Sequence, residues 1–241
     1  MRTRIQKNIV KPSMEILYQD NHLIAVNKKP SEIVQGDKTG DKPLSETVAE
    51  YLARRLEKPG DAFIGVIHRL DRPASGVVLF AKTSKGLERM NEMFRDHLIK
   101  KTYWAVVKDK PAKEADTLIH YLLRDTERNK SMLYNDEVEG SQRAELDYKV
   151  IHNIENYSLL EIDLKTGRHH QIRAQLAKIG CPIKGDLKYG FPRSNINASI
   201  HLHARKIEFK HPVKLEPIAI TANPPFDSVW GAFMKELFPK Y

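Results

Sequence analysis

A carboxylate set between two guanidinium groups is the feature of this sequence with the clearest potential for chemistry. Asp71 lies between Arg69 and Arg72, in a short polar segment that runs from His68 to Gly76. A neighbouring cation favours the ionised form of a carboxyl group, and an ionised carboxylate can act as a nucleophile or stabilise positive charge on a substrate. On local sequence alone, an ion-pair cluster at the surface explains the same residues equally well.

The residues that follow must hold this carboxylate in place. The apolar run Val77–Ala81 comes directly after Gly76 and is followed by the polar residues 82–84. An uninterrupted apolar run of this kind, bounded by a glycine and polar residues, predicts a buried strand. Asp71 would then lie at the mouth of that strand.

The segment reads His-Arg-Leu-Asp-Arg-Pro-Ala-Ser-Gly and, together with the strand after it, resembles the signature of the RluA-type pseudouridine synthases. Further blocks resemble the same family in the same order, from about residue 16 to residue 212. They are the opening stretch Asp20–Pro30, the Lys-x-Tyr-x-Ala-x-Val strand Lys101–Val107, the Thr-Gly-Arg-x-His-Gln-Ile-Arg motif within Leu164–Arg173, and the blocks Gly185–Gly190 and Leu202–Pro212. The resemblance implies an isomerase that converts specific uridines in ribosomal RNA or tRNA to pseudouridine.

The resemblance also implies catalytic roles for Asp71, Tyr103 and Arg173. Breaking the bond between uracil and ribose develops oxocarbenium character in the sugar, and Asp71 would either attack the sugar covalently or act on it as a base. Arg173 would keep Asp71 ionised and oriented through a charge-assisted pair, single or bidentate. Tyr103 would stack on the extruded uracil with its phenol near the carbon 5 proton. A phenol is a poor base at neutral pH unless the site assists it, and Arg173 could supply that help.

Five further residues are candidates for contact with RNA. The target base is normally stacked, so the enzyme must extrude it before it reacts. Arg69 or Arg72 could fill the vacated space or grip the flanking phosphates, and the resemblance favours Arg69 for the first task. Arg168, His170 and Gln171 are expected to shape the site and the RNA groove rather than perform chemistry.

Three positions depart from the family pattern, and two other functions stay open. Ala74, Gln175 and Glu32 stand where the family usually has Thr, His and Gly, which bears on substrate choice and loop geometry. A nucleoside or glycoside hydrolase could use the same carboxylate, but that chemistry needs a second carboxylate or an activated water, and no partner motif is visible. A protein that binds RNA without catalysis is the other alternative.

Composition and charge narrow the class of protein. The 241 residues carry a formal net charge of +9, which predicts attraction to a polyanion, with nucleic acid first and an anionic membrane surface second. The single Cys181 cannot form an intramolecular disulfide, and neither a signal peptide nor a membrane-spanning run is visible. We therefore expect a cytoplasmic protein with RNA and not a membrane as its partner. The ten histidines lack metal-ligand spacing and no nucleotide-binding glycine pattern occurs, so neither metal nor cofactor is expected.

Periodicity and turn residues predict a single α+β domain with a large mixed, mostly antiparallel sheet flanked by helices and loops. Strands are predicted on both sides of an Asp-Asn turn within 16–28, and at 77–81, 102–107, 146–151, 158–164 and 199–209. Helices are predicted from an N-cap at Ser45 to Pro59-Gly60, from Ser84 with Leu87, Met90, Phe94 and Leu98 buried, across 172–179, and near the C-terminus with Phe226, Val229, Trp230, Phe233 and Leu237 buried. The polar stretch 124–143 would be either a mobile functional arm or a weak hairpin.

This pattern gives the expected domain organisation. Residues 1–14 form a short basic tail and residues 15–241 the catalytic domain. Many members of the resembled family carry a small RNA-binding domain ahead of the catalytic one, and that domain is expected to be absent here. Recognition of RNA would then fall to the catalytic domain, the 124–143 arm and the tail, largely through shape and electrostatics. We expect a monomer with no obligate protein partner.

Overall fold

The structure is a computed structural model that describes residues 14–56 and 62–239. The expected basic tail falls outside the described residues except for Met14, and so does the Pro59-Gly60 end of the first helix. No helix in the described part of the chain is long and apolar enough to cross a membrane.

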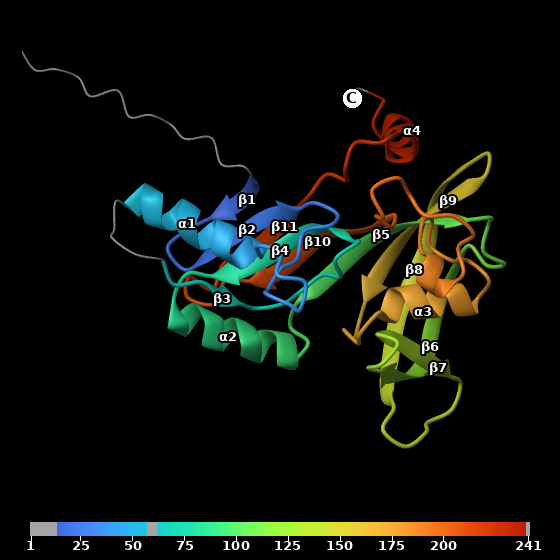
Figure 1. The fold of residues 1–241 in the computed structure, drawn as a ribbon, viewed down its shortest axis with the longest axis horizontal. Coiled ribbons are helices and arrows are strands. Elements are labelled where there is room, and N and C mark those ends of the chain that lie inside the picture. Colours follow the sequence, from blue (N-terminus) through green and yellow to red (C-terminus); the bar gives the residue numbers. More distant parts are fainter. Residues whose placement is uncertain (1–13, 57–61, 240–241) are drawn as a thin grey trace, which may run out of the picture.

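One sheet of 11 strands organises the molecule (Figure 1). Its main path runs β1 (Glu15–Gln19), β2 (Leu23–Lys28), β4 (Ser75–Ala81), β10 (Leu202–Lys210), β5 (Lys100–Lys108), β9 (Tyr157–Leu164), β8 (Gln142–Ile154), β6 (Ala115–Asp125) and β7 (Lys130–Tyr134), while β3 (Gly65–Val66) pairs with β4 and β11 (Pro217–Thr221) with β10. Among the described strands, only β4 and β10 pair in parallel. The predicted α+β fold with a mixed, mostly antiparallel sheet is confirmed.

The helices are divided between the two halves of the sheet. They are α1 (Leu44–Leu56), α2 (Ser84–Arg95), α3 (Gln171–Lys178), the short 3-10 helix η1 (Leu187–Tyr189) and α4 (Ser228–Leu237). In Figure 1, α1 and α2 lie on the left with β1 to β4, whereas α3 lies on the right against β6 to β9, and β10 and β5 run between the two halves. The catalytic segments predicted from sequence come from both halves.

Strand alternation explains why α1 and α2 lie on opposite faces. Successive side chains of a strand point to opposite faces of a sheet. Ile24 and Phe80 therefore face α1, while Ala25 and Leu79 face α2, and all four are fully buried. Because both faces are covered, β2 and β4 read in the sequence as continuous apolar runs.

A close approach of two main chains holds the centre of the sheet together. Gly76 of β4 pairs in parallel with Ala204 of β10 and adopts a φ of +117°. A Cβ atom at Gly76 would overlap the main chain of Ala204. Glycine is therefore required here, since it accepts this φ and leaves room for the neighbouring strand.

Several predicted details are wrong, for local reasons. Helix α1 begins at Leu44, so Ser45 is not its N-cap. Helix α2 ends at Arg95, and the positive φ of His97 turns the chain, so Leu98 leaves the helical period and is 63% exposed. Phe226 precedes α4 and is 99% exposed.

The 124–143 arm is a hairpin rather than a mobile loop. Strands β6 and β7 pair antiparallel from Tyr121 opposite Tyr134 to Asp125 opposite Lys130. The sequence signal is weak because one face of this hairpin is solvated, so few of its side chains are apolar. Its other face packs on α3, where Leu122 of β6 and Leu133 of β7 cluster with Ala174.

Candidate active site

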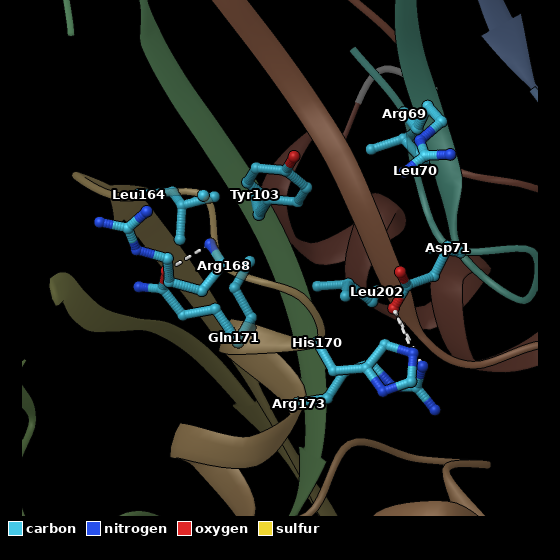
Figure 2. A pocket seen from close by; sticks show the side chains of 13 residues that line it. Arg69, Leu70, Asp71, Tyr103, Leu164, Arg168, His170, Gln171, Arg173 and Leu202 are labelled. Carbon is cyan, nitrogen blue, oxygen red and sulfur yellow. Dashed lines mark hydrogen bonds and ion pairs between the residues drawn. The ribbon is translucent and has the colours of Figure 1, made fainter. Parts of the chain in front are cut away.

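A cavity of about 110 Å³ opens where the two halves of the sheet meet (Figure 2). It is lined by Arg69, Leu70, Asp71, Ala74, Tyr103, Leu164, Gly167, Arg168, His170, Gln171, Ile172, Arg173 and Leu202. The structure therefore brings together seven of the eight residues predicted from sequence. The eighth, Arg72, does not line the cavity and instead forms an exposed ion pair with Asp41.

The turn that carries Asp71 is fixed by its own main chain and by a buried lysine. The amide of Ala74 donates to the carbonyl of Asp71 over 3.0 Å. The ammonium of Lys28 donates to the carbonyls of Arg72 (3.1 Å), Ala74 (2.6 Å) and Lys29 (3.1 Å). Lys28 is 1% exposed, and burial lowers its pKa to about 8. Three main-chain acceptors compensate for removing this ammonium from water, so Lys28 acts as a clamp on the loop behind Asp71.

His68, which opens the motif, has a structural role. Its Nε2 accepts a hydrogen bond from the amide of Leu79 over 3.1 Å, and its ring stacks on Phe94 at 5.1 Å between centroids. Burial, with a smaller effect of Lys101, lowers the pKa of His68 to about 4. The neutral ring can accept from Leu79, which anchors the start of the Asp71 segment to β4.

Two nitrogen atoms approach one oxygen of Asp71, and one of them, from Arg173, donates a hydrogen bond to it. Nη1 of Arg173 lies 2.9 Å from Oδ2 of Asp71, and Nε2 of His170 lies 3.5 Å from the same oxygen. Figure 2 shows both contacts from the same side of the carboxylate. Oδ1 has no hydrogen bond or ion pair to any residue that the structure describes. One oxygen is thus held and the other is left for a substrate.

The bidentate partner of Arg173 is Asp186, not Asp71. Nε and Nη2 of Arg173 donate to the two oxygens of Asp186 over 2.7 and 2.8 Å, which leaves Nη1 for Asp71. The side chains of Arg173 and Asp186 are only 5% and 1% exposed. Burial opposes the charge of Arg173, but Asp186 and Asp71 raise its pKa above the ordinary value. Asp186 lies in the Gly185–Gly190 block, where sequence reasoning gave it no role.

Tyr103 presents its ring to the cavity but is not prepared to act as a base. It lies on β5 and contacts both the core cluster under α3 and the one under α1. Burial and the charge of Asp71 raise the pKa of the Tyr103 phenol. Both effects keep the phenol protonated, and the help expected from Arg173 stays a prediction.

Gln171 shapes the rim of the cavity rather than facing solvent. Its Oε1 accepts from the Arg168 amide (3.0 Å) and the Thr166 hydroxyl (2.8 Å), while its Nε2 donates to the Glu145 carbonyl (3.0 Å). These bonds fix the turn between β9 and α3. Nε of Arg168 donates to the carbonyl of Arg143 over 3.0 Å, and Arg69 is exposed on the other side of the cavity.

Nothing in residues 14–56 and 62–239 gathers three or more His, Cys, Asp or Glu side chains in a group that could hold a metal ion. His203 of β10 is instead used in the core, where Nδ1 contacts the Ser75 hydroxyl (2.9 Å) and Nε2 the Ala222 carbonyl (3.0 Å).

Comparison with known proteins gives matches over most of the chain. The profile of the RNA pseudouridylate synthase family matches residues 22–178. tRNA pseudouridine synthase C of Vibrio cholerae is 31% identical, over 92% of this chain and 95% of that protein. Ribosomal large subunit pseudouridine synthase D of Zymomonas mobilis is 30% identical, over 89% of this chain and 70% of that protein. The solved structure of human RNA pseudouridylate synthase domain containing 4 covers 92% of both chains with a TM-score of 0.72 and 23% identity.

The fold and these matches define the class of protein, which is an isomerase acting on uridine in RNA. The chain belongs to the RNA pseudouridylate synthase family. The family and the reaction class predicted from the signature and the further sequence blocks are thereby confirmed. The roles of the individual residues stay predictions.

Proposed function

We propose that this chain converts specific uridines in structured RNA, either tRNA or ribosomal RNA, to pseudouridine, with Asp71 as the catalytic carboxylate. One observation carries the assignment of the residue: Arg173, locked by Asp186, donates to Oδ2 of Asp71 at the wall of the cavity. The two classes of RNA come from the names of relatives, one a tRNA enzyme and the other a ribosomal RNA enzyme.

The proposed reaction is redox-neutral and needs no co-reactant. The bond between N1 of uracil and C1′ of ribose breaks, and the base leaves with the bonding electron pair. Asp71 either bonds to C1′ through an oxygen or takes a proton from C2′. After the base turns, C5 bonds to C1′ as the bond from Asp71 to C1′ breaks or as Asp71 returns the proton to C2′. The C5 proton then departs and N1 gains a proton. Either route restores the carboxylate, and the free oxygen Oδ1 suits both.

The remaining cavity residues receive supporting roles in this proposal. The Tyr103 ring provides a stacking surface for the extruded uracil, and its phenol donates rather than accepts a hydrogen bond while it stays protonated. Exposed Arg69 fills the space that the base vacates, and Arg168 contacts the RNA backbone at the opposite rim. Arg72 contributes to RNA binding only if its pair with Asp41 opens.

A hydrolase is not favoured by this geometry. Asp186 is the second carboxylate at the site, but both of its oxygens accept from Arg173 and its side chain is 1% exposed. It cannot activate a water molecule in that state. Base release without rejoining therefore has no second carboxylate, besides Asp71, to activate water among the cavity residues in the described part of the chain.

We also propose a cytoplasmic enzyme that acts as a single catalytic domain spanning residues 15–241. The buried free thiol of Cys181 suits a reducing compartment. Asp71, Tyr103, Arg173 and Asp186 all come from one chain, so a monomer contains the whole candidate site.

The test of the proposed function is tritium release from RNA labelled at carbon 5 of uracil, with tRNA and ribosomal RNA assayed separately. Wild type is expected to release tritium from one pool and to leave pseudouridine in it. Asp71→Asn is expected to bind RNA with unchanged affinity and release nothing, because the amide is neither nucleophile nor base. Turnover by Asp71→Asn would contradict the assignment of Asp71 as the catalytic carboxylate. RNA binding without turnover by wild type would favour the alternative of an RNA-binding protein without catalysis.

A further inference from the structure

Nε2 of His170, which lies 3.5 Å from Oδ2 of Asp71, has no role in the reaction described above. We propose that His170 positions Asp71 as a neutral hydrogen-bond donor through Nε2–H, and that the hydroxyl of Tyr189 fixes this tautomer. The inference rests on the proposed function in one respect, which is that Asp71 is the reacting group. It adds a positioning residue and links the β6–β7 hairpin to the site.

The backbone aims the His170 ring at Asp71. His170 precedes α3 at its N-cap position with φ 52° and ψ 23°, the left-handed conformation, and its side chain caps no amide of the helix. This conformation is unfavourable for a non-glycine residue, and strain of this kind concentrates at functional sites. The ring instead places Nε2 3.5 Å from Oδ2 of Asp71 and Nδ1 3.0 Å from the oxygen of Tyr189.

The hydrogen bonds around the Tyr189 oxygen determine which ring nitrogen of His170 carries the proton. The amide of Ser131 donates to this oxygen over 2.8 Å, so the oxygen already acts as an acceptor there. The hydroxyl proton of Tyr189 can go to Nδ1 of His170 at 3.0 Å or to the Ser131 carbonyl at 3.5 Å. The shorter contact is the stronger hydrogen bond. With Nδ1 as acceptor, the ring proton sits on Nε2 and points at Asp71.

The surroundings keep the His170 ring neutral. Burial, followed by the charges of Arg173, His169, Lys188 and Arg124, lowers the pKa of His170 to about 2. A neutral N–H donates to a carboxylate without adding a second cation beside Arg173. Both groups are therefore directed at Oδ2, which leaves Oδ1 sterically open to the sugar.

Ser131 connects this arrangement to the β6–β7 hairpin. Besides its amide contact with Tyr189, its hydroxyl donates to the carbonyl of His169 over 2.5 Å and lies 3.0 Å from Nδ1 of His169. The rings of His169 and His170 stack at 3.8 Å between centroids. The hairpin thus holds both the backbone and the tautomer of the residue that contacts Asp71.

The first measurement is the tautomer itself, by long-range ¹H–¹⁵N correlation on the full chain with ¹⁵N-labelled histidine at neutral pH. The His170 signals are assigned by their loss in His170→Gln. We expect a protonated Nε2 and an unprotonated Nδ1. A protonated Nδ1 or an imidazolium in wild type would overturn the proposal. This result does not depend on activity, so a wild type that forms no pseudouridine would refute the proposed function separately.

The second measurement is single-turnover kinetics on the RNA that wild type modifies. His170→Leu is expected to lower the rate about tenfold with RNA affinity unchanged, the effect of losing one hydrogen bond to a charged group. His170→Gln keeps an N–H donor near the same place and is expected to recover most of the rate. An unchanged rate in His170→Leu, or equal losses in both variants, would contradict the proposal.

Tyr189→Phe tests whether the hydroxyl of Tyr189 fixes the tautomer of His170. It removes the hydroxyl proton from Nδ1, so a second, Nδ1-protonated population is expected in the spectrum together with a slower rate. Tyr148→Phe is the matched control, because Tyr148 is another buried tyrosine whose hydroxyl contacts only the Lys113 carbonyl (3.3 Å). It is expected to leave the His170 signals and the rate unchanged, and a Tyr189→Phe spectrum identical to wild type would refute this role of Tyr189.

Discussion

At the scale of single residues, the candidate site depends on one guanidinium shared between two carboxylates. Arg173 uses two nitrogens to bind Asp186 and one to bind Asp71, so the partly exposed carboxylate is positioned by a pair that is itself buried. A buried ion pair contributes little net stability compared with apolar residues, but removing one partner leaves an uncompensated charge. The pair therefore serves geometry rather than stability.

This reasoning predicts that stability and activity can be separated. Arg173→Met alone should destabilise the protein by about 3 kcal/mol, because it strands the ionised Asp186 in the interior. The double variant Arg173→Met with Asp186→Leu should regain most of that stability and remain inactive, since Asp71 still lacks its main donor. Chemical denaturation gives the stabilities and tritium release the activities. A double variant as unstable as the single one would contradict the explanation.

The sequence identifies Asp71, Tyr103 and Arg173 because each lies in a motif whose residues are adjacent along the chain. Asp186 and Tyr189 also lie in a recognised block, but their roles come from contacts between side chains of different elements. No spacing along the sequence could show that Arg173 turns two of its nitrogens away from Asp71. The tautomer of His170 likewise depends on an amide in a distant hairpin.

At the scale of elements, the turn between β1 and β2 joins two parts of the sheet. Asp20 accepts hydrogen bonds from the amides of His22 and Leu23, each over 2.8 Å. Its other oxygen lies 2.8 Å from Nε2 of the buried His211 and 3.4 Å from the ammonium of Lys214, both in the β10–β11 connection. The sequence predicted the turn, but not that its carboxylate docks the other connection.

The stability supplied by this turn should depend on pH in a defined window. Burial alone would raise the pKa of Asp20, but hydrogen bonds from Leu23, His22 and Tyr18 and the charge of His211 lower it from 3.8 to about 2. Because the folded pKa is depressed, the stabilisation is present above the unfolded pKa and lost as pH falls through about 2. Asp20→Asn should cost roughly 2 kcal/mol at neutral pH, and its stability should converge with that of wild type in acid.

Thermal unfolding across this pH range checks the Asp20 prediction. Asp96→Asn is the control, because Asp96 is 52% exposed and pairs only with its neighbour Arg95. A pH profile of Asp20→Asn parallel to wild type would show that the carboxylate contributes nothing.

The sequence predicted well the elements whose apolar residues form a clear pattern. It predicted poorly the elements that have a solvent-exposed face. β2 and β4 are buried on both faces, and α3 carries its apolar residues at helical spacing, so their sequences determine them directly. The short β11 is held by pairing with β10, and the β6–β7 hairpin is held by pairing of β6 with β8. Such strands are determined by register and tertiary contacts more than by their own composition.

At the scale of the whole molecule, cations differ in their surroundings on the two sides of the sheet. Beside the cavity, Arg124 and Lys188 are exposed, and both lie close enough to help burial lower the pKa of His169. On the face opposite Tyr103, Lys149 pairs with Glu161 and Lys206 with Glu208, each at 2.8 Å. A polyanion that reaches the cavity should therefore contact Arg124 and Lys188. It should not contact Lys149 and Lys206.

This asymmetry predicts which cations contribute to RNA binding. Each phosphate neutralised by a cation contributes about 0.7–0.9 to the slope of log K against log salt. Arg124→Ala with Lys188→Ala should therefore reduce the slope for the substrate RNA by roughly 1–2, whereas Lys149→Ala with Lys206→Ala should leave it unchanged despite the same loss of charge. Filter-binding titrations at several salt concentrations measure both slopes. If the two double variants lose slope equally, the net charge of +9 attracts RNA without orienting it, and orientation must come from contacts inside the cavity alone.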